Sequence, residues 1–278
     1  MKPNGKELNI LSLGAGVQST CVYLMACEGE LHLDAAIYAD VQEEPQAVVD
    51  HLAWLRSLQG IPIFIRTAGK IGDDLLQGQN STGQRFASIP AFTGVAGGPV
   101  GRLRRQCTSE YKIQVVDRCL RRDILKLAPR QRIPRGTTIH WYFGISLEEA
   151  RRTRGILKRM TKTPWATAHF PLIDRGMTRR DCQRWMEGRV PHIVPRSACV
   201  FCPYHDDLEW QRIKDTDSAS WNRAIQIDRG LRSGTILQRK VIKPMYLHRS
   251  LIPLEFVEFK KEKSLPLFTE ECEGMCGN

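Results

Sequence analysis

The stretch Ile10–Leu31, ILSLGAGVQSTCVYLMACEGEL, determines how the N-terminal part of the chain is organised. Its apolar residues up to Leu13 predict a buried strand, its two glycines mark a turn, and Val17–Cys27 has a helical pattern. A glycine-rich turn between a strand and a helix exposes backbone N–H groups at the positive end of the helix dipole, where phosphate binds well. The stretch therefore predicts either a phosphate-binding loop or an ordinary strand-to-helix turn.

Further predicted strands alternate with predicted helices along the chain. The strands cover 35–39, 62–65 and 140–145, and one helix runs from Pro45 to Leu58. This alternation predicts an α/β fold with a doubly wound, mostly parallel sheet and right-handed crossovers. Ligands in such sheets bind at the carboxyl ends of the strands. Gly14–Thr20 and Asp40–Pro45 both fall at that edge.

The remainder of the chain predicts one long loop and a C-terminal appendage. Residues 67–101 carry 8 of the 22 glycines with little periodicity, which predicts a long mobile loop. A helix is expected over 109–127, and Thr178 is placed to cap another helix, with Asp181 three residues on. We expect a nucleotide-binding α/β domain over 1–195 and a cysteine-bearing segment folded back on the sheet over 196–278.

The positive charge of the protein is concentrated in one quarter of its 278 residues. The chain has a net charge of +11, and the stretch from Arg102 to Lys162 holds 17 Lys/Arg against 5 Asp/Glu. The stretch forms either a solvated basic face or a surface that binds a polyanion. Because nearly all the excess positive charge lies in this stretch, a polyanion such as nucleic acid is favoured. No segment resembles a membrane span or a signal peptide, so we expect a cytoplasmic protein without membrane contact.

Nine cysteines are many for a protein of a reducing compartment, where clustered thiols suggest metal or redox chemistry. Cys199 and Cys202 form a C-x-x-C turn, and two thiols alone are too few for a metal centre. Cys107 and the tail, ECEGMCGN with Cys272 and Cys276, offer further ligands. All-cysteine ligation permits zinc or an iron–sulfur cluster, and His205 also permits a zinc site. The cysteines predicted to be buried apolar thiols within helices are Cys21, Cys27, Cys119 and Cys182.

The glycine turn is similar to a known phosphate-binding motif. Gly14–Ser19, GAGVQS, resembles the S-G-G-x-D-S loop of the PP-loop ATP-pyrophosphatase superfamily, without its first serine and its aspartate. Four later segments resemble, in family order, motifs of the phosphoadenylyl-sulfate (PAPS) reductase-like branch: YADVQEEP, CTSEYKI, FGISLEEA and FPLIDRGMTRRDCQRW. Ser146 in the third segment occupies a position where arginine is usual. The resemblance spans about Asn9 to Cys202 and implies an adenine nucleotide alpha hydrolase-like fold.

The resemblance also implies a set of binding residues. ATP would bind with its phosphates on the turn, near Ser12, Gly14, Ala15, Gly16, Gln18, Ser19 and Thr20. Asp40 would contact adenosine or Mg²⁺, and Lys112 would neutralise phosphate. Further candidates for phosphate contact are Arg151, Arg152 and Arg154. Between zinc and an iron–sulfur centre, the resemblance favours a [4Fe–4S] cluster on Cys107, Cys199, Cys202 and Cys276. Cys272 would then be a thiolate or persulfide carrier.

These features together predict an enzyme that splits ATP and transfers sulfur. It would adenylate a nucleic-acid acceptor, release pyrophosphate, and thiolate a tRNA base or a DNA backbone with sulfur from a donor such as a cysteine desulfurase. One alternative is a phosphoadenylyl-sulfate reductase, which reduces PAPS to sulfite without splitting ATP. A second alternative is a non-catalytic iron–sulfur protein that binds nucleic acid.

Overall fold

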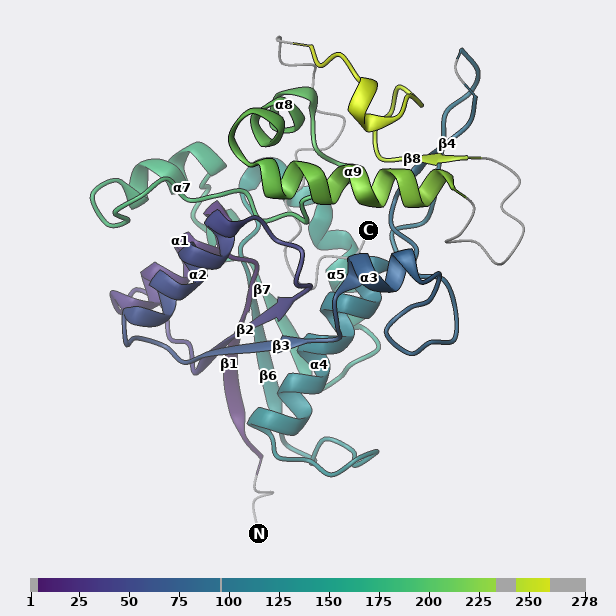
Figure 1. Cartoon of the computed structure of the whole chain (residues 1–278). Helices are drawn as coiled ribbons and strands as arrows, with labels where there is room; N and C mark the ends of the chain where they lie inside the picture. Colours follow the sequence, from purple (N-terminus) through teal and green to yellow (C-terminus); the bar gives the residue numbers. More distant parts are fainter. Residues whose placement is uncertain (1–4, 96, 234–243, 261–278) are drawn as a thin grey trace.

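A computed structural model describes residues 5–95, 97–233 and 244–260 (Figure 1). Its main sheet has five parallel strands in the order β3-β2-β1-β6-β7. These strands are β1 (Glu7–Leu13), β2 (Ala35–Asp40), β3 (Ile63–Thr67), β6 (Thr138–Phe143) and β7 (Ala166–His169). The predicted α/β class with a mostly parallel sheet is confirmed. The sequence did not reveal β7, because its four residues, ATAH, are too few to show a pattern.

Helices cover both faces of this sheet because its central strands are apolar on both sides. Leu11 and Leu13 of β1 pack with α1 (Val17–Cys27), α2 (Gln46–Ser57) and α7 (Arg179–Met186), whereas Ile10 faces α4 (Gln114–Cys119) and α5 (Thr153–Met160). The short helix α6 (Pro171–Asp174) precedes α7. Thr178 and Asp181 form the expected capping box at the start of α7.

The strand order places a topological switch point beside β1. From β1 the chain proceeds to β2 and β3 on one side, and it later returns to β6 and β7 on the other side. In open α/β sheets, ligands bind outside the carboxyl ends of the strands at such a point. The turn after β1, Gly14–Gly16, and the turn after β6, Gly144–Ser146, both lie there.

The prediction of one long loop over 67–101 is wrong in part. This stretch contains α3 (Ile71–Leu76) and β4 (Phe92–Thr93), and it ends at β5 (Gly101–Arg102). Elements of two to six residues between glycines are too short to show a period, which explains the error. The helix expected over 109–127 is confirmed as one helical run, formed by η1 (Thr108–Ile113), α4 and η2 (Leu120–Ile124).

The described part of the C-terminal segment contains α8 (Asp207–Thr216), α9 (Ser218–Arg232), β8 (Met245–Tyr246) and a short turn of helix, η4 (Leu254–Phe256). Figure 1 shows α8 and α9 at one end of the molecule, beyond the sheet. Phe201 and Trp210 share a buried core with Ile71, Leu75 and Tyr111. The boundary at 195/196 stays a prediction.

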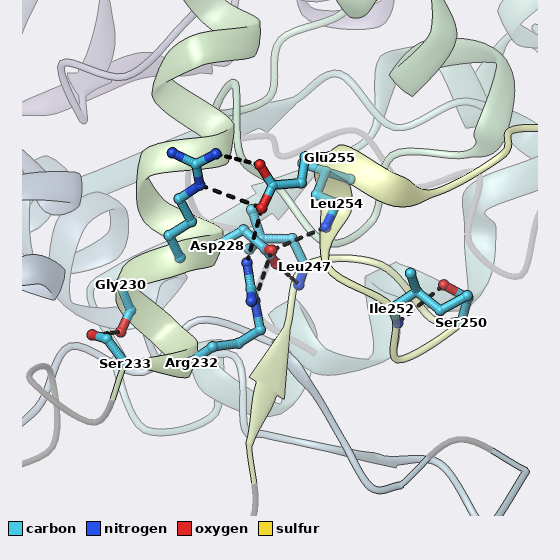
Figure 2. Close-up of polar contacts among 10 residues, drawn as sticks. Asp228, Gly230, Arg232, Ser233, Leu247, Ser250, Ile252, Leu254 and Glu255 are labelled. Atoms are coloured by element: carbon cyan, nitrogen blue, oxygen red, sulfur yellow. Dashed lines mark hydrogen bonds and ion pairs between the residues drawn. The ribbon is translucent and has the colours of Figure 1, made fainter.

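A buried carboxylate of α9 holds the backbone around β8 and η4 in place. Asp228 is 1% exposed and accepts backbone N–H bonds from Leu247 and Leu254, both at 3.0 Å (Figure 2). Arg232 Nε lies 3.2 Å from the same carboxylate. Asp228 thus satisfies two backbone donors that would otherwise be buried without a partner.

Candidate functional site at the carboxyl edge of the sheet

The turn after β1 is a tightly built loop that leaves a helix N-terminus uncapped. Gly16 is the N-cap of α1, and no side chain caps this end. Ser19 Oγ accepts the Gly14 N–H at 3.1 Å and donates to the Gly16 carbonyl at 3.4 Å. Ala15 has a φ of 59°, a left-handed conformation that costs a non-glycine residue about 1 kcal/mol. The first N–H groups of α1 are the orphan donors that favour an anion.

Ser12 adds a second polar group at this point. Its hydroxyl is buried at the end of β1, and the described residues offer it no hydrogen-bond partner. A buried hydroxyl without a partner costs about 1–3 kcal/mol. A ligand that hydrogen-bonds this hydroxyl would remove that cost, so the site fits a polar group such as a nucleotide phosphate.

Gln18 and Ser146 occupy positions at which the chain differs from the motifs it resembles, and the two residues are in contact. Gln18 Nε2 lies 3.3 Å from Ser146 Oγ and 3.0 Å from Glu149 Oε2. The motifs have aspartate and arginine at the Gln18 and Ser146 positions. The two residues that differ from these motifs are thus joined by a hydrogen bond between neutral side chains.

Two arginines surround this pair. Arg179 Nη1 donates to Gln18 Oε1 at 3.3 Å, and Arg152 Nη1 donates to Glu149 Oε1 at 2.8 Å. Arg152 and Glu149 are both buried, so this ion pair is part of the support beneath the loop. Of the three arginines predicted to contact phosphate, Arg152 is thus engaged with Glu149, and Arg151 and Arg154 are exposed.

Gly144 brings the turn after β6 against the first turn of α1. A Cβ atom added there would lie 2.5 Å from the Ser19 nitrogen and 2.6 Å from its Cα. Only glycine permits this approach, because the opposing atoms are backbone and cannot rotate away. The position of the loop therefore depends on β6 as well as on β1.

A pair of histidines supports the loop from the other side. Thr20 Oγ1 lies 2.8 Å from His51 Nε2, and His51 Nδ1 lies 2.8 Å from His192 Nε2. Burial, together with a smaller repulsion from His192, lowers the pKa of His51 to about 4. His51 is therefore neutral at pH 7 and holds the Thr20 side chain by a hydrogen bond.

Asp40 and Lys112 have partners that their predicted roles did not include. Asp40 Oδ1 accepts the Gln42 N–H at 2.7 Å, which stabilises a turn in which Gln42 has a φ of 58°. Lys112 Nζ lies 3.6 Å from Glu44 Oε1, and both side chains are buried. Both residues lie at the carboxyl edge, Asp40 at the end of β2 and Lys112 in η1.

Three predicted ligand cysteines line one pocket. Cys107 precedes η1, Cys199 and Cys202 come from the segment between α7 and α8, and Arg105 and Lys112 line the same pocket. Val41, which directly follows β2, also lines it, so the pocket opens at the carboxyl edge of the sheet. The other two cysteines predicted to belong to the site, Cys272 and Cys276, lie outside the described residues.

The C-x-x-C turn has a fixed backbone. The Cys202 N–H donates to the Cys199 carbonyl at 2.9 Å, and the Val200 N–H donates to the Glu43 carbonyl at 2.8 Å, which ties the turn to the segment after β2. His205 Nε2 lies 2.9 Å from the Cys199 carbonyl. Because a carbonyl only accepts, Nε2 carries the proton and supports the turn. His205 is not among the residues that line the pocket, so its position does not favour the zinc site.

The donor set fits a thiolate-bound metal in its chemistry. Thiolates suit iron–sulfur clusters, and Arg105 lines the same pocket as the three thiols. Among residues 5–95, 97–233 and 244–260, no group of three or more His, Cys, Asp or Glu side chains is arranged to hold a metal ion. The three thiols are therefore gathered in one pocket without the geometry of a complete site.

One prediction for the remaining cysteines is wrong. Cys21, Cys119 and Cys182 are buried, as expected, but Cys27 is exposed. Cys27 is the last residue of α1, where the helix emerges from the core. Burial raises the pKa of the Cys119 thiol to about 12, which keeps it protonated and unreactive.

Sequence reasoning missed Gly144, His51 and Arg179. Gly144 lies near the end of the predicted strand 140–145, at the ligand edge, and that position could have drawn attention to it. His51 and Arg179 have no local signal, because their partners Thr20 and Gln18 are 31 and 161 positions away.

Comparisons with family models, curated proteins and solved structures found no match. No helix in the described part of the chain is long and apolar enough to cross a membrane.

Proposed function

We propose that the protein is a PP-loop ATP-pyrophosphatase of the PAPS reductase-like type that carries a [4Fe–4S] cluster and transfers sulfur to nucleic acid. The observation that carries this proposal is the meeting of Cys107, Cys199 and Cys202 in one pocket. That pocket lies at the same edge of the sheet as the uncapped glycine loop. Nucleotide activation and sulfur chemistry are thereby proposed for one edge of one domain.

The loop would bind the phosphates of ATP. The N–H groups of the first turn of α1 and the Ser12 hydroxyl supply donors, and Gly14 and Gly16 allow phosphate to approach the backbone. An acceptor oxygen attacks the α-phosphorus, and the bond to the β-phosphate breaks with release of pyrophosphate. A sulfur nucleophile then bonds to the activated carbon or phosphorus, and AMP leaves with the oxygen.

The pocket would supply the sulfur side of the reaction. Cys107, Cys199 and Cys202 are the proposed ligands of the cluster, with Cys276 as the fourth and Cys272 as the sulfur carrier. With Cys276 as the fourth ligand every iron would carry a cysteine, so the transferred sulfur would be held by Cys272 rather than by the cluster. Arg105 and Lys112 at the pocket would stabilise the anionic thiolates and any phosphate that reaches them.

The test is pyrophosphate release from ATP by anaerobically purified protein, measured with tRNA, with single-stranded DNA and with no acceptor. The proposal expects release that depends on one of the nucleic acids, together with sulfur incorporated into it. Sulfite formation from PAPS without ATP cleavage would instead identify a reductase. A folded protein that binds nucleic acid but shows neither reaction would be a binding protein.

The loop assignment has its own test, Gly16→Val. A valine side chain would occupy the space through which phosphate approaches the backbone, so nucleotide affinity is expected to fall at least tenfold, about 1.4 kcal/mol. Nucleotide affinity is measured by calorimetry, and circular dichroism checks the fold. Unchanged affinity in a folded variant would remove the loop from the site.

A further inference from the structure

Two adjoining hollows lie on the flank of the sheet, between the η1–α4–η2 helix and the end of α5. They share Arg121, Arg122 and Trp165 in their linings. Seven lysine or arginine side chains line the two hollows together, against one carboxylate, Asp117. We call this surface the basic groove; its principal residues are Arg118, Arg121, Arg122, Lys162 and Trp165.

Among the described residues, little of the charge of Arg118, Arg121, Arg122 and Lys162 is compensated. Arg121 Nε lies 2.9 Å from Asp117 Oδ2, and both side chains are about a third exposed or more, so solvent screens this pair. Arg122 Nη1 donates to the Leu127 carbonyl, which leaves its charge without a counterion. Neither Arg118 nor Lys162 pairs with a carboxylate in the described residues. Cations gathered without partners repel one another, and an anion that binds them relieves the repulsion.

Trp165 supplies an aromatic surface among these cations. Its ring packs partly against the core between the sheet and α4, and the Arg121 guanidinium carbon lies 5.6 Å from the ring centroid. A positively charged groove with an aromatic side chain is the arrangement that binds single strands, because phosphates lie on the cations and a base stacks on the ring. The bases of a duplex are already stacked on one another and do not need such a ring.

The basic groove and the thiol pocket are connected by one helical run. Lys112 of η1 lines the thiol pocket, and Arg122 of η2 lines the groove. Ten residues separate them, which corresponds to roughly 15 Å along a helix. By contrast, Arg102 and Arg105 lie over the Tyr204 ring, close to the thiol pocket. The basic stretch 102–162 therefore supplies cations both to the thiol pocket and to the basic groove.

We propose that the basic groove binds single-stranded nucleic acid, with phosphates on Arg118, Arg122 and Lys162 and one base stacked on Trp165. The inference rests on the proposed function, since it assigns the groove to the acceptor, but this binding requires neither ATP nor a cluster. The groove would hold the strand roughly 15 Å from the thiol pocket. A neighbouring nucleotide of the same strand could then reach the carboxyl edge of the sheet.

The test measures fluorescence anisotropy of a labelled 12-nucleotide RNA or DNA single strand and of the matched duplex over a range of salt concentrations. The groove variant R118A/R122A/K162A is compared with R184A/R212A/R229A, which removes the same charge from exposed sites on α7, α8 and α9. The groove variant is expected to bind at least tenfold more weakly. The slope of log affinity against log salt concentration should be smaller by about 2 in magnitude. Each phosphate contact with a single strand contributes about 0.7 to that slope, and three contacts are removed. The control variant should change affinity less than twofold.

Trp165 is tested separately because it also packs against the core. W165A is expected to weaken binding several-fold without changing the salt slope, and W165F should retain most of the affinity because it keeps an aromatic face. Equal losses in the groove and control triple variants would overturn the proposal, since net charge alone would then explain binding. Duplex affinity equal to that of the single strand would overturn it as well.

The same samples separate this inference from the proposed function. If groove variants bind normally while nucleic acid still stimulates pyrophosphate release, the groove assignment is wrong and the proposed function stands. If the groove binds single strands but no nucleic acid stimulates pyrophosphate release, the groove assignment stands and the proposed function is wrong.

Discussion

The glycine loop and the thiol pocket lie at the same edge of the sheet but are built in different ways. The loop, Ser12–Thr20, is one contiguous stretch in which every residue is buried. The pocket joins Cys107 to Cys199 and Cys202, which are about ninety positions further along the chain, and all three thiols are partly exposed. The loop is thus a local structure with distant supports, whereas the pocket exists only because the fold brings separate segments together.

The largest difference between the two regions is expected when a pocket thiol is removed. Cys199→Ser, purified anaerobically, should lose its iron, its broad visible absorption and its sulfur transfer, because only two of the proposed ligand thiols would remain in the pocket. Nucleotide affinity at the loop should remain. Cys27→Ser, which removes an exposed thiol outside the pocket, is the matched control and should keep its iron. Iron content equal in the two variants would show that the pocket holds no cluster.

The same comparison explains how much the sequence could predict. The β1–loop–α1 unit was predictable because strand, glycines and helix follow one another, and so were the parallel sheet and the cap at Thr178. The ligand cysteines were chosen by spacing and resemblance, but no sequence pattern shows that Cys107 and Cys199 line the same pocket. That fact depends on the paths of η1 and the segment after α7.

Other features depended on contacts that leave no local pattern. Gln18 and Ser146 are 128 positions apart, so their contact could not be seen in the sequence. The charge of the basic stretch is visible in the sequence, but only the fold shows that its cations line both the thiol pocket and the basic groove. Trp165 lies just before β7, the strand that was too short to predict.

The next largest effect concerns the histidine that supports the loop. Below pH 6.5 an unfolded histidine binds a proton, whereas folded His51 stays neutral to about pH 4 because burial lowers its pKa. The unfolded state therefore binds more protons, and the free energy of unfolding falls as pH drops from 6.5 to 4. At about 1.4 kcal/mol per pKa unit, His51 contributes about 3 kcal/mol to that fall.

Replacing His51 with glutamine should remove this part of the pH dependence. Urea unfolding at pH 7 and at pH 4 measures the difference, which should be about 3 kcal/mol smaller in His51→Gln than in the unaltered protein. His32→Gln, at an exposed position, is the control variant. An identical pH dependence in both variants would mean that His51 is not buried as a neutral group.

A smaller effect is expected at Gly144, which positions the loop from β6. In Gly144→Ala the new methyl group would contact the Ser19 backbone, and the forced shift should cost about 1–3 kcal/mol of stability. Nucleotide affinity should fall with it. Gly176→Ala is the control, since it has a φ of +64° but no atom within 4 Å, and it should lose stability without losing affinity. Equal nucleotide affinity in the two variants would show that β6 does not position the loop.

The smallest effect is the most specific for the loop, because it separates ligand binding from folding. Ser12 and Ser197 both have buried hydroxyls without partners in the described residues, one beside the loop and the other just before the C-x-x-C turn. Removing such a hydroxyl leaves stability unchanged or slightly higher, because no hydrogen bond is lost. If nucleotide phosphate is the missing partner of Ser12, Ser12→Ala should weaken nucleotide binding roughly three- to tenfold, about 1 kcal/mol. Ser197→Ala should leave that affinity unchanged. Calorimetric titration of both variants compares the two regions directly, and equal affinities would mean that the Ser12 hydroxyl does not contact the nucleotide.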